Sequence, residues 1–140
     1  KNVNFFIKDS KVGWVMGAFL FMKREVVDAT NGFDENFFMY MEEVEWCKRI
    51  NSLGFNIWYT PTFEITHLDK ASSKKFPEKL RKIYRNEILG VIYFMRKYYL
   101  AQIKWLLPAI KIGLFTRILT FTLNGNKMRQ EAYLETVREI

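Results

Sequence analysis

The sequence has few of the residues that cross-link a chain or interrupt its elements: one cysteine, one histidine and three prolines among 140 residues. A single cysteine, Cys47, excludes an internal disulfide. Its place between Trp46 and Lys48 in a helical pattern predicts a small buried residue in a reducing compartment, with a reactive thiol as the alternative. No internal repeat is present. With 49% apolar and 26% charged residues, the composition is that of a globular chain, and a chain of 140 residues is expected to form one domain.

A run of residues that could span a membrane is also missing. Uncharged stretches such as Ile88–Met95 and Ile118–Asn126 fall well short of the ~18 apolar residues that a spanning helix needs. No pattern of a secretory signal occurs either. We therefore expect a cytoplasmic chain, one that can lie on the inner membrane surface as a peripheral protein but does not cross the membrane.

Acidic residues are scarce in the second half of the sequence. Residues 1–69 hold 7 Lys and Arg against 10 Asp and Glu, a net charge of −3, whereas residues 70–140 hold 15 against 5, a net charge of +10. The polar stretch Ala71–Lys75 marks the change and predicts a boundary between segments 1–70 and 71–140. A basic half rich in Tyr, Trp, Phe and Leu favours an anionic membrane surface as partner first and nucleic acid second.

The first half shows the order strand, helix, helix, strand, which favours an α/β architecture. Its first strand is a nearly continuous apolar run that predicts burial on both faces, and Gly17–Ala18 in its middle indicate a close approach to the backbone. Asn31–Gly32 and Gly54 predict left-handed caps after the two helices. The expected elements are a strand over Val12–Met22, helices over Lys23–Thr30 and Glu42–Leu53, a strand over Phe55–Thr60 and an extended segment over Phe63–His67.

The second half predicts helices. Apolar residues keep to one broad face of a helix from Pro77 to Ile103, and Pro108 is expected to interrupt the helical pattern. A second apolar helix is predicted over Ala109–Leu123. A turn at Asn124–Asn126 then leads into a short, charged terminal helix.

Three glutamates, Glu42, Glu43 and Glu45, stand close together just behind the aromatic run Phe37–Met41. The simple interpretation is a helix start with a solvated acidic edge, because carboxylates in the first turn interact favourably with the helix dipole. The alternative is an active-site carboxylate, which the same dipole keeps in the ionised form that a base requires. Glu42 and Glu45 are expected at the helix edge or in the pocket of such a site, with Glu45 as the solvated residue.

A series of short motifs follows a recognisable order along the first half of the sequence. The motifs are Trp14–Phe19, Lys23–Glu25, Asn31–Glu35, Phe37–Cys47, Gly54–Phe55, Tyr59–Pro61 and His67. Taken together they resemble the carboxy-terminal half of the family 2 glycosyltransferases, in particular the bacterial rhamnosyltransferase-type enzymes of polysaccharide synthesis. The resemblance covers roughly residues 12–67, with a weaker match in the basic helices that follow.

The resemblance implies the nucleotide-sugar-binding GT-A fold and an inverting transfer, in which an acceptor hydroxyl attacks the anomeric carbon while a nucleoside diphosphate leaves. Residues 1–70 would be the acceptor-side half of that α/β domain, and residues 71–140 a basic amphipathic helical extension. The family's Glu-Asp pair falls on Glu42 and Glu43, so the resemblance makes Glu43 the general base, with Glu42 beside it. The second position is Glu where the family has Asp, which moves the carboxylate one methylene further from the backbone.

Other residues take roles by the same resemblance. Gly17 and Ala18 would leave room for the donor and acceptor sugars, and Trp14 would lie on the wall of the substrate pocket, with a core position as the alternative. Asp34 would structure its loop at the substrate side. His67 would contact a divalent metal ion, Mn²⁺ or Mg²⁺, or the diphosphate. The alternative for a lone histidine near a strand end is a structural role.

The Asp-x-Asp motif that holds the metal in the family does not occur in this sequence. The resemblance therefore implies half a site, whose metal would bind only together with the family's amino-terminal half. Because the sequence begins at Lys1 and not at methionine, we leave open that the chain is a fragment, a processed product or a domain that pairs with another chain. Whether the chain alone is an enzyme stays open on the same ground.

The implied partners are a nucleotide-sugar donor, a saccharide or lipid-linked acceptor and a membrane surface, and self-association is left open. Two other classes of function are alternatives. One is a non-catalytic interaction or scaffold domain that keeps half of a transferase fold, and the other is a basic module for membrane surfaces or nucleic acid. Nucleic acid is not expected as a partner, because no recognised motif for it occurs and the aromatic residues follow helical apolar spacing.

Overall fold

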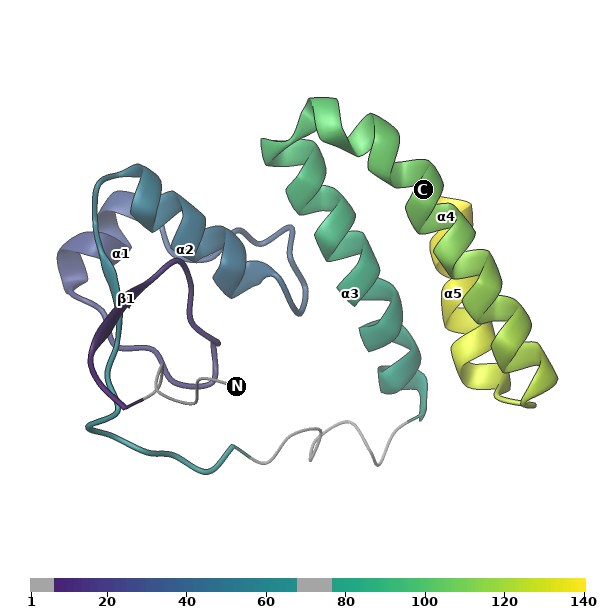
Figure 1. Ribbon diagram of the computed structural model, residues 1–140, viewed down its shortest axis with the longest axis horizontal. Helices are drawn as coiled ribbons and strands as arrows, with labels where there is room; N and C mark the ends of the chain where they lie inside the picture. Colours follow the sequence, from purple (N-terminus) through teal and green to yellow (C-terminus); the bar gives the residue numbers. More distant parts are fainter. Residues whose placement is uncertain (1–6, 68–76) are drawn as a thin grey trace. The chain divides into compact units, whose positions relative to one another are not determined.

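The computed structural model describes residues 7–67 and 77–140 (Figure 1). These residues fold as two compact units, one made of residues 7–37 and 42–67 and the other of residues 38–41 and 77–140. The regular elements of the described ranges are β1 (Ser10–Val12), α1 (Arg24–Thr30), α2 (Glu42–Ser52), β2 (Ile57–Tyr59), α3 (Pro77–Tyr98), α4 (Leu100–Leu123) and α5 (Lys127–Glu139).

The first unit combines β1, α1, α2 and β2. The two strands pair antiparallel, with Lys11 opposite Trp58 at the centre of the short ladder. Its core forms where α1 and α2 meet, around the buried side chains of Val26, Trp46 and Ile50. Partly buried apolar residues from the flanking segments complete this core, namely Met22, Val27, Phe55 and Ile57.

Both helices of the first unit end as their sequences predict. Asn31, which caps α1, has a φ of 59°, and Gly32 after it has a φ of 72°. Gly54 follows α2 with a φ of 86°. Asparagine and glycine tolerate this left-handed conformation better than other residues, so these caps stop both helices and confirm the predicted boundaries to within one or two residues.

The predicted strand over Val12–Met22 is wrong beyond its first residue. Only Val12 belongs to β1, and Gly17–Ala18 lie in a turn instead of a ladder. A strand buried on both faces needs hydrogen-bonding neighbours at its edges, and the described ranges supply a two-stranded sheet alone. Without such neighbours the apolar run stays irregular and exposes Trp14, Met16, Phe19 and Phe21. The segment Phe63–His67 likewise forms no strand.

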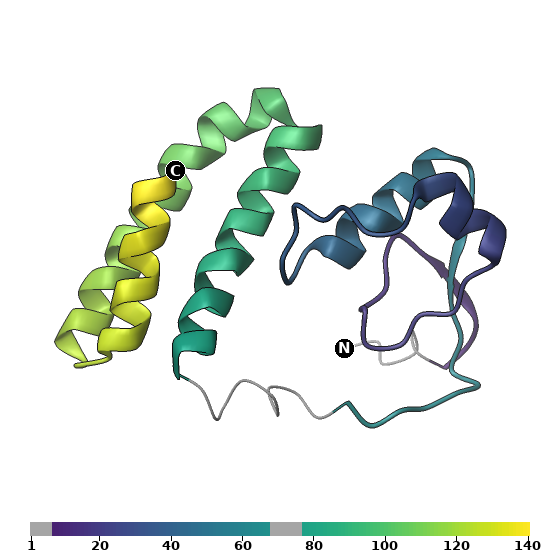
Figure 2. The same cartoon turned by 180° about the vertical axis from the view of Figure 1, so that it is seen from behind.

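The second unit is built from α3, α4 and α5. In both views α3 leads through a sharp bend into α4, and α5 runs back alongside α4 (Figures 1 and 2). Ile92, Ile103 and Leu114 are buried where the helices pack, and the ring of Tyr133 on α5 stacks on Phe121 with 5.7 Å between ring centroids. Ion pairs along the outside tie α3 to α5, namely Arg81 with Glu131 and Glu135, and Arg85 with Glu139.

The predicted break at Pro108 is also wrong, because α4 continues through this proline. The helix break lies instead at Tyr99, whose φ of −137° and ψ of 51° are not helical. A proline inside a helix costs about 3 kcal/mol, which packing on both sides of it can offset. Ile103 and Leu114 flank Pro108 and are both buried, so tertiary packing keeps this helix continuous. The GT-A architecture itself stays a prediction.

Candidate active site at the start of helix α2

The two predicted catalytic carboxylates, Glu42 and Glu43, open α2. The two residues before them, Tyr40 and Met41, have φ angles of 67° and 72°. A non-glycine residue in this left-handed region costs on the order of 1 kcal/mol or more, and such strain gathers at functional sites. The chain therefore enters α2 by a strained reversal placed immediately before the carboxylates.

The carboxylates of Glu42 and Glu43 each have one buried oxygen without a hydrogen-bond partner. In the described part of the chain, Oε2 of both residues is covered by protein and meets no donor. Burial raises the pKa of the Glu42 carboxyl above its ordinary value, and the negative charge of Glu43 raises it further. Two buried acceptors that lack donors, on successive residues at the start of α2, suit a ligand that brings hydroxyl groups.

Gly17 lies against the stem of Glu43. A Cβ atom on this glycine would be 3.6 Å from Glu43 Cβ and 3.9 Å from Cγ. The backbone of the turn at Gly17–Ala18 therefore passes close to the predicted base. Ala18 itself is exposed in the same turn.

Two further residues of α2 face the same segment. The pKa of the Cys47 thiol is raised by burial and by the charge of Glu43, against a hydrogen bond from the Val15 backbone. Asn51 Nδ2 donates to the carbonyl oxygen of Gly13 at 2.8 Å and to that of Cys47 at 2.9 Å. Cys47 is 4% exposed, which confirms the predicted buried thiol.

These three contacts follow one another along α2. Residues 43, 47 and 51 of α2 meet residues 17, 15 and 13 of the segment in turn. The irregular stretch 13–17 therefore runs along α2, and this contact brings Gly17 to Glu43.

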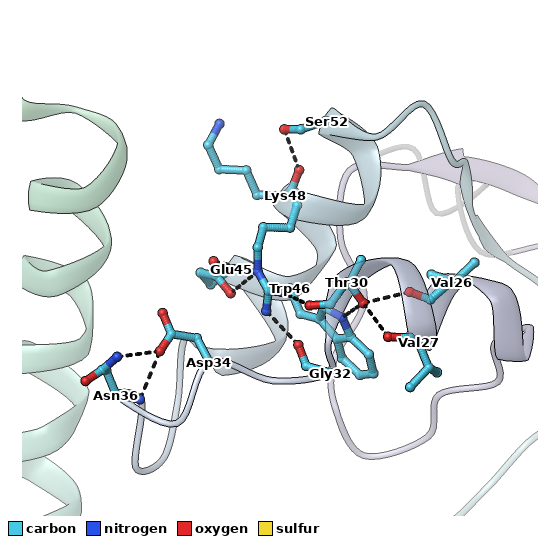
Figure 3. Close-up of polar contacts among 11 residues, drawn as sticks. Val26, Val27, Thr30, Gly32, Asp34, Asn36, Glu45, Trp46, Lys48 and Ser52 are labelled. Carbon is cyan, nitrogen blue, oxygen red and sulfur yellow. Dashed lines mark hydrogen bonds and ion pairs between the residues drawn. The ribbon is translucent and has the colours of Figure 1, made fainter.

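Another side of α2 is fixed to α1 by Trp46. Its indole Nε1 donates to the hydroxyl of Thr30 at 2.7 Å, and that hydroxyl donates to the carbonyl oxygen of Val26 at 2.7 Å (Figure 3). The Trp46 ring also packs on Phe33, with 4.3 Å between ring centroids. The buried indole and the buried hydroxyl therefore satisfy each other's hydrogen bonds.

Glu45 is not solvated, so this expectation is wrong. Its side chain is 0% exposed and accepts two hydrogen bonds from Arg49 Nε, at 2.8 and 2.9 Å. Arg49 also donates to the carbonyl oxygens of Thr30 and Gly32, the latter at 2.7 Å. The arginine fork needs an acceptor on each side, and Glu45 supplies one of them from the interior. The spacing of Glu45 and Arg49, four residues apart, is the sequence signal that could have found this pair.

The loop between α1 and α2 is held by Asp34. Its Oδ1 accepts from the backbone N–H of Asn36 at 3.0 Å and from Asn36 Nδ2 at 2.7 Å (Figure 3). This is a local turn of the kind that aspartate forms with the chain two residues ahead. Asp34 thus structures its loop, as the sequence predicts.

The structure does not bring Trp14 or His67 into this arrangement. Trp14 is 53% exposed, which excludes the core position. His67 is exposed in the irregular segment after β2. Residues 7–67 and 77–140 contain no group of three His, Cys, Asp or Glu side chains that could hold a metal ion. The described residues therefore form no metal site by themselves, and no chemical step is assigned to a metal here.

Curated rhamnosyltransferases match about half of the chain. Rhamnosyltransferase WbbL of Escherichia coli (strain K12) is 31% identical over 71 residues, which are 51% of this chain and 27% of the relative. The N-acetylglucosaminyl-diphospho-decaprenol L-rhamnosyltransferase of Mycobacterium tuberculosis (strain CDC 1551 / Oshkosh) is 36% identical over 66 residues, which are 47% of this chain and 22% of the relative. No family model and no solved structure matches.

These matches show that about half of the chain is related to glycosyltransferases of the rhamnosyltransferase kind. The chain spans about a quarter of the length of the curated relatives it matches.

Proposed function

We propose that this chain carries the acceptor-side part of an inverting family 2 glycosyltransferase of the GT-A fold, with Glu43 as general base. The observation that carries the proposal is that Oε2 of Glu42 and Oε2 of Glu43 are both buried without donors, with the backbone of Gly17 close to the stem of Glu43. The relationship to rhamnosyltransferases supports a sugar transfer as the reaction and rhamnose as the sugar.

In the proposed reaction one proton is transferred, one bond to the anomeric carbon forms and one breaks. A hydroxyl of the acceptor donates a hydrogen bond to the carboxylate of Glu43, which takes the proton as the hydroxyl oxygen attacks the anomeric carbon of the donor sugar. The bond from that carbon to the nucleoside diphosphate breaks, and the diphosphate leaves with the electron pair. Attack opposite to the leaving group inverts the configuration at the anomeric carbon.

Glu42 has a different part in this proposal. Because its pKa is raised, its carboxyl holds a proton more readily than an ordinary glutamate. Its buried Oε2 lacks a hydrogen-bond donor, so it can bind a second hydroxyl of the acceptor. We therefore assign Glu42 to acceptor binding and Glu43 to proton removal.

The acceptor is proposed to be a saccharide or a lipid-linked saccharide. The name of the mycobacterial relative gives N-acetylglucosaminyl-diphospho-decaprenol as its acceptor, which supports the lipid-linked choice for this chain. The donor is proposed to be a nucleotide sugar. A cytoplasmic location, a divalent cation, the sugar contacts of Gly17, Ala18 and Trp14, and self-association stay predictions.

Glu43→Gln in the complete polypeptide tests the proposal, because glutamine keeps the shape but cannot take the proton. We expect transfer of labelled rhamnose from its nucleotide donor to fall by about 10²- to 10⁴-fold in kcat, with donor binding kept. Glu43→Asp should retain a larger part of the activity, since the carboxylate remains and its reach alone is shortened.

The matched control is Glu25→Gln, which removes an exposed glutamate from the first turn of α1. It should leave kcat within about twofold, as surface substitutions outside a site do. If Glu43→Gln transfers sugar at the rate of this control, Glu43 is not the base. The non-catalytic scaffold would then be the better account of the first unit.

A further inference from the structure

Helix α4 carries apolar side chains on the side that faces away from its neighbours. Its inner side, with Ile103 and Leu114, is buried against the rest of the second unit. On the other side a stripe of four apolar residues lies exposed, with Trp105 at 85% and Leu123 at 77%. We call this the outer stripe of α4, made of Trp105, Ile112, Leu119 and Leu123.

The two lysines of α4 border the outer stripe instead of occupying it. At about 100° per residue, Lys104 and Lys111 fall to one side of the stripe, whereas Arg117 falls toward α5 and donates from Nη1 to the hydroxyl of Tyr133 at 3.2 Å. An ordinary surface helix has the reverse order, with its charges at the centre of the exposed side. The exposed side of α4 is therefore an apolar strip with a basic border along one edge, made of Lys104 and Lys111.

Length and composition alone would allow α4 to cross a membrane. Among the residues that the structure describes, it is the one helix that is long and apolar enough. Its 24 residues extend about 36 Å, against about 30 Å for the hydrocarbon core of a bilayer. The sequence alone predicts no such helix, because its uncharged stretches fall short of the ~18 apolar residues that a spanning helix needs.

The packing of α4 argues against crossing. Helix α5 lies alongside it and carries Glu131, Glu135 and Glu139, which pair with arginines of α3. A crossing α4 would draw these ion pairs into the hydrocarbon, where each charged side chain costs about 2.5 kcal/mol or more. A helix that lies flat in the interface avoids that cost, because only its outer stripe leaves the water.

The basic border decides between a lipid surface and a second copy of the chain. Helix α4 contains no Asp or Glu, so two copies joined through their outer stripes would bring the four lysines of their basic borders together. Anionic headgroups, in contrast, complement Lys104 and Lys111. Residues 77–140 as a whole hold 12 Lys and Arg against 5 Asp and Glu, which adds to the attraction.

We propose that α4 lies in the plane of an anionic phospholipid membrane, with its outer stripe inserted among the acyl chains and its basic border at the headgroups. The proposal does not depend on the function proposed for α2, and it assigns the membrane contact to one side of one helix. It predicts binding with two separable contributions, one apolar and one electrostatic.

The test measures sedimentation of the full chain with phospholipid vesicles, either phosphatidylcholine alone or with about one third phosphatidylglycerol. We expect binding to the anionic vesicles that weakens in 0.5 M salt (about 4 Å of screening length) and is not fully lost. Trp105→Gln with Leu119→Gln should weaken it by about tenfold or more. The matched control is Trp58→Gln, which removes a tryptophan that is 61% exposed on β2 and should change binding by less than about twofold.

Three results would overturn the proposal. The first is binding that the double variant leaves unchanged while its helical circular dichroism is intact. The second is a chain that resists extraction from membranes by alkaline carbonate, which would mean that α4 spans them. The third is a chain that ignores vesicles and sediments as a dimer that Trp105→Gln with Leu119→Gln dissociates, which would assign the outer stripe to a second copy.

Discussion

Helices α2 and α4 use their side chains in opposite ways. Helix α2 turns charged and polar groups inward, where Glu45 and Arg49 join its neighbours and Glu42 and Glu43 keep buried oxygens without donors. Helix α4 turns apolar groups outward and keeps Lys104 and Lys111 at their border. Each helix departs from the usual order of polar outside and apolar inside, and in each the departure indicates what it meets. Helix α2 is suited to a ligand with hydroxyl groups, and α4 to a lipid surface.

The largest expected effect comes from breaking the inward ion pair of α2. Arg49→Gln leaves the buried carboxylate of Glu45 without its partner and removes the donors to the carbonyls of Thr30 and Gly32. We expect the free energy of unfolding, measured by urea titration of the full chain, to fall by about 3–5 kcal/mol.

A second pair in the same unit provides the control for Arg49→Gln. Arg24 and Asp28 have the same spacing and the same 2.8 Å distance, but both are exposed. Arg24→Gln should therefore cost about 0.5 kcal/mol or less. If the two variants lose the same free energy of unfolding, burial of the Glu45–Arg49 pair adds nothing to its contribution to stability. The inward polar groups of α2 would then no longer distinguish it from α4.

An intermediate effect is expected at Thr30, the hydroxyl between α1 and α2. Thr30→Val keeps the shape but leaves the Trp46 indole N–H buried without an acceptor, so stability should fall by about 1–3 kcal/mol in the same titration. Thr30→Ser keeps the hydroxyl and should lose less. On α4, Thr120→Val removes an exposed hydroxyl that bonds to Thr116 and should stay within about 0.5 kcal/mol. A loss at Thr120 as large as that at Thr30 would contradict this interpretation.

The smallest expected effect concerns pH and Glu42. Its pKa is raised from 4.5 in the folded chain, so the folded state holds this proton more tightly than the unfolded state. Stability from this group is complete below pH 4.5, falls as the pH rises through the raised pKa and then levels off. Glu42→Gln should remove that fall, so the variant should gain stability relative to the native chain between pH 4 and pH 7.

The control for this pH effect is Glu25→Gln, because Glu25 is exposed on α1. Urea midpoints at the two pH values should then differ by the same amount in this variant and in the native chain. If Glu42→Gln behaves like the control, the carboxyl of Glu42 is as well solvated as that of Glu25. The two buried oxygens would then be a weaker sign of a ligand.

Local chemistry made part of the fold predictable. Asn31 and Gly54 sit where helices must stop, and the acidic first turn marks the start of α2, so both helices follow from the sequence. The apolar run after Val12 was misread because a strand depends on neighbours that no local pattern reveals. The position of the helix break in the second unit is unpredictable for the same reason. Packing of α4 along α5 outweighs the helix-breaking preference of Pro108, so the chain bends at Tyr99 and not at the proline.

The candidate site, like the fold, could be predicted from the sequence only in part. The family resemblance singled out Gly17 and Glu43, and the structure brings the two together. The burial of Glu45 and the left-handed backbone at Tyr40 and Met41 depend on the folded surroundings of α2, so no residue pattern signalled them beyond the four-residue spacing of Glu45 and Arg49.

The lone thiol of Cys47 has a practical consequence. It is covered on α2 next to segment 13–17, and its raised pKa keeps it in the unreactive protonated form. An alkylating reagent can modify it only when that cover lifts, so the modification rate counts those opening events. Because the chain has no other cysteine, the rate reports on this place alone. The rate of Cys47 alkylation therefore measures how often the segment beside Glu43 moves away from α2.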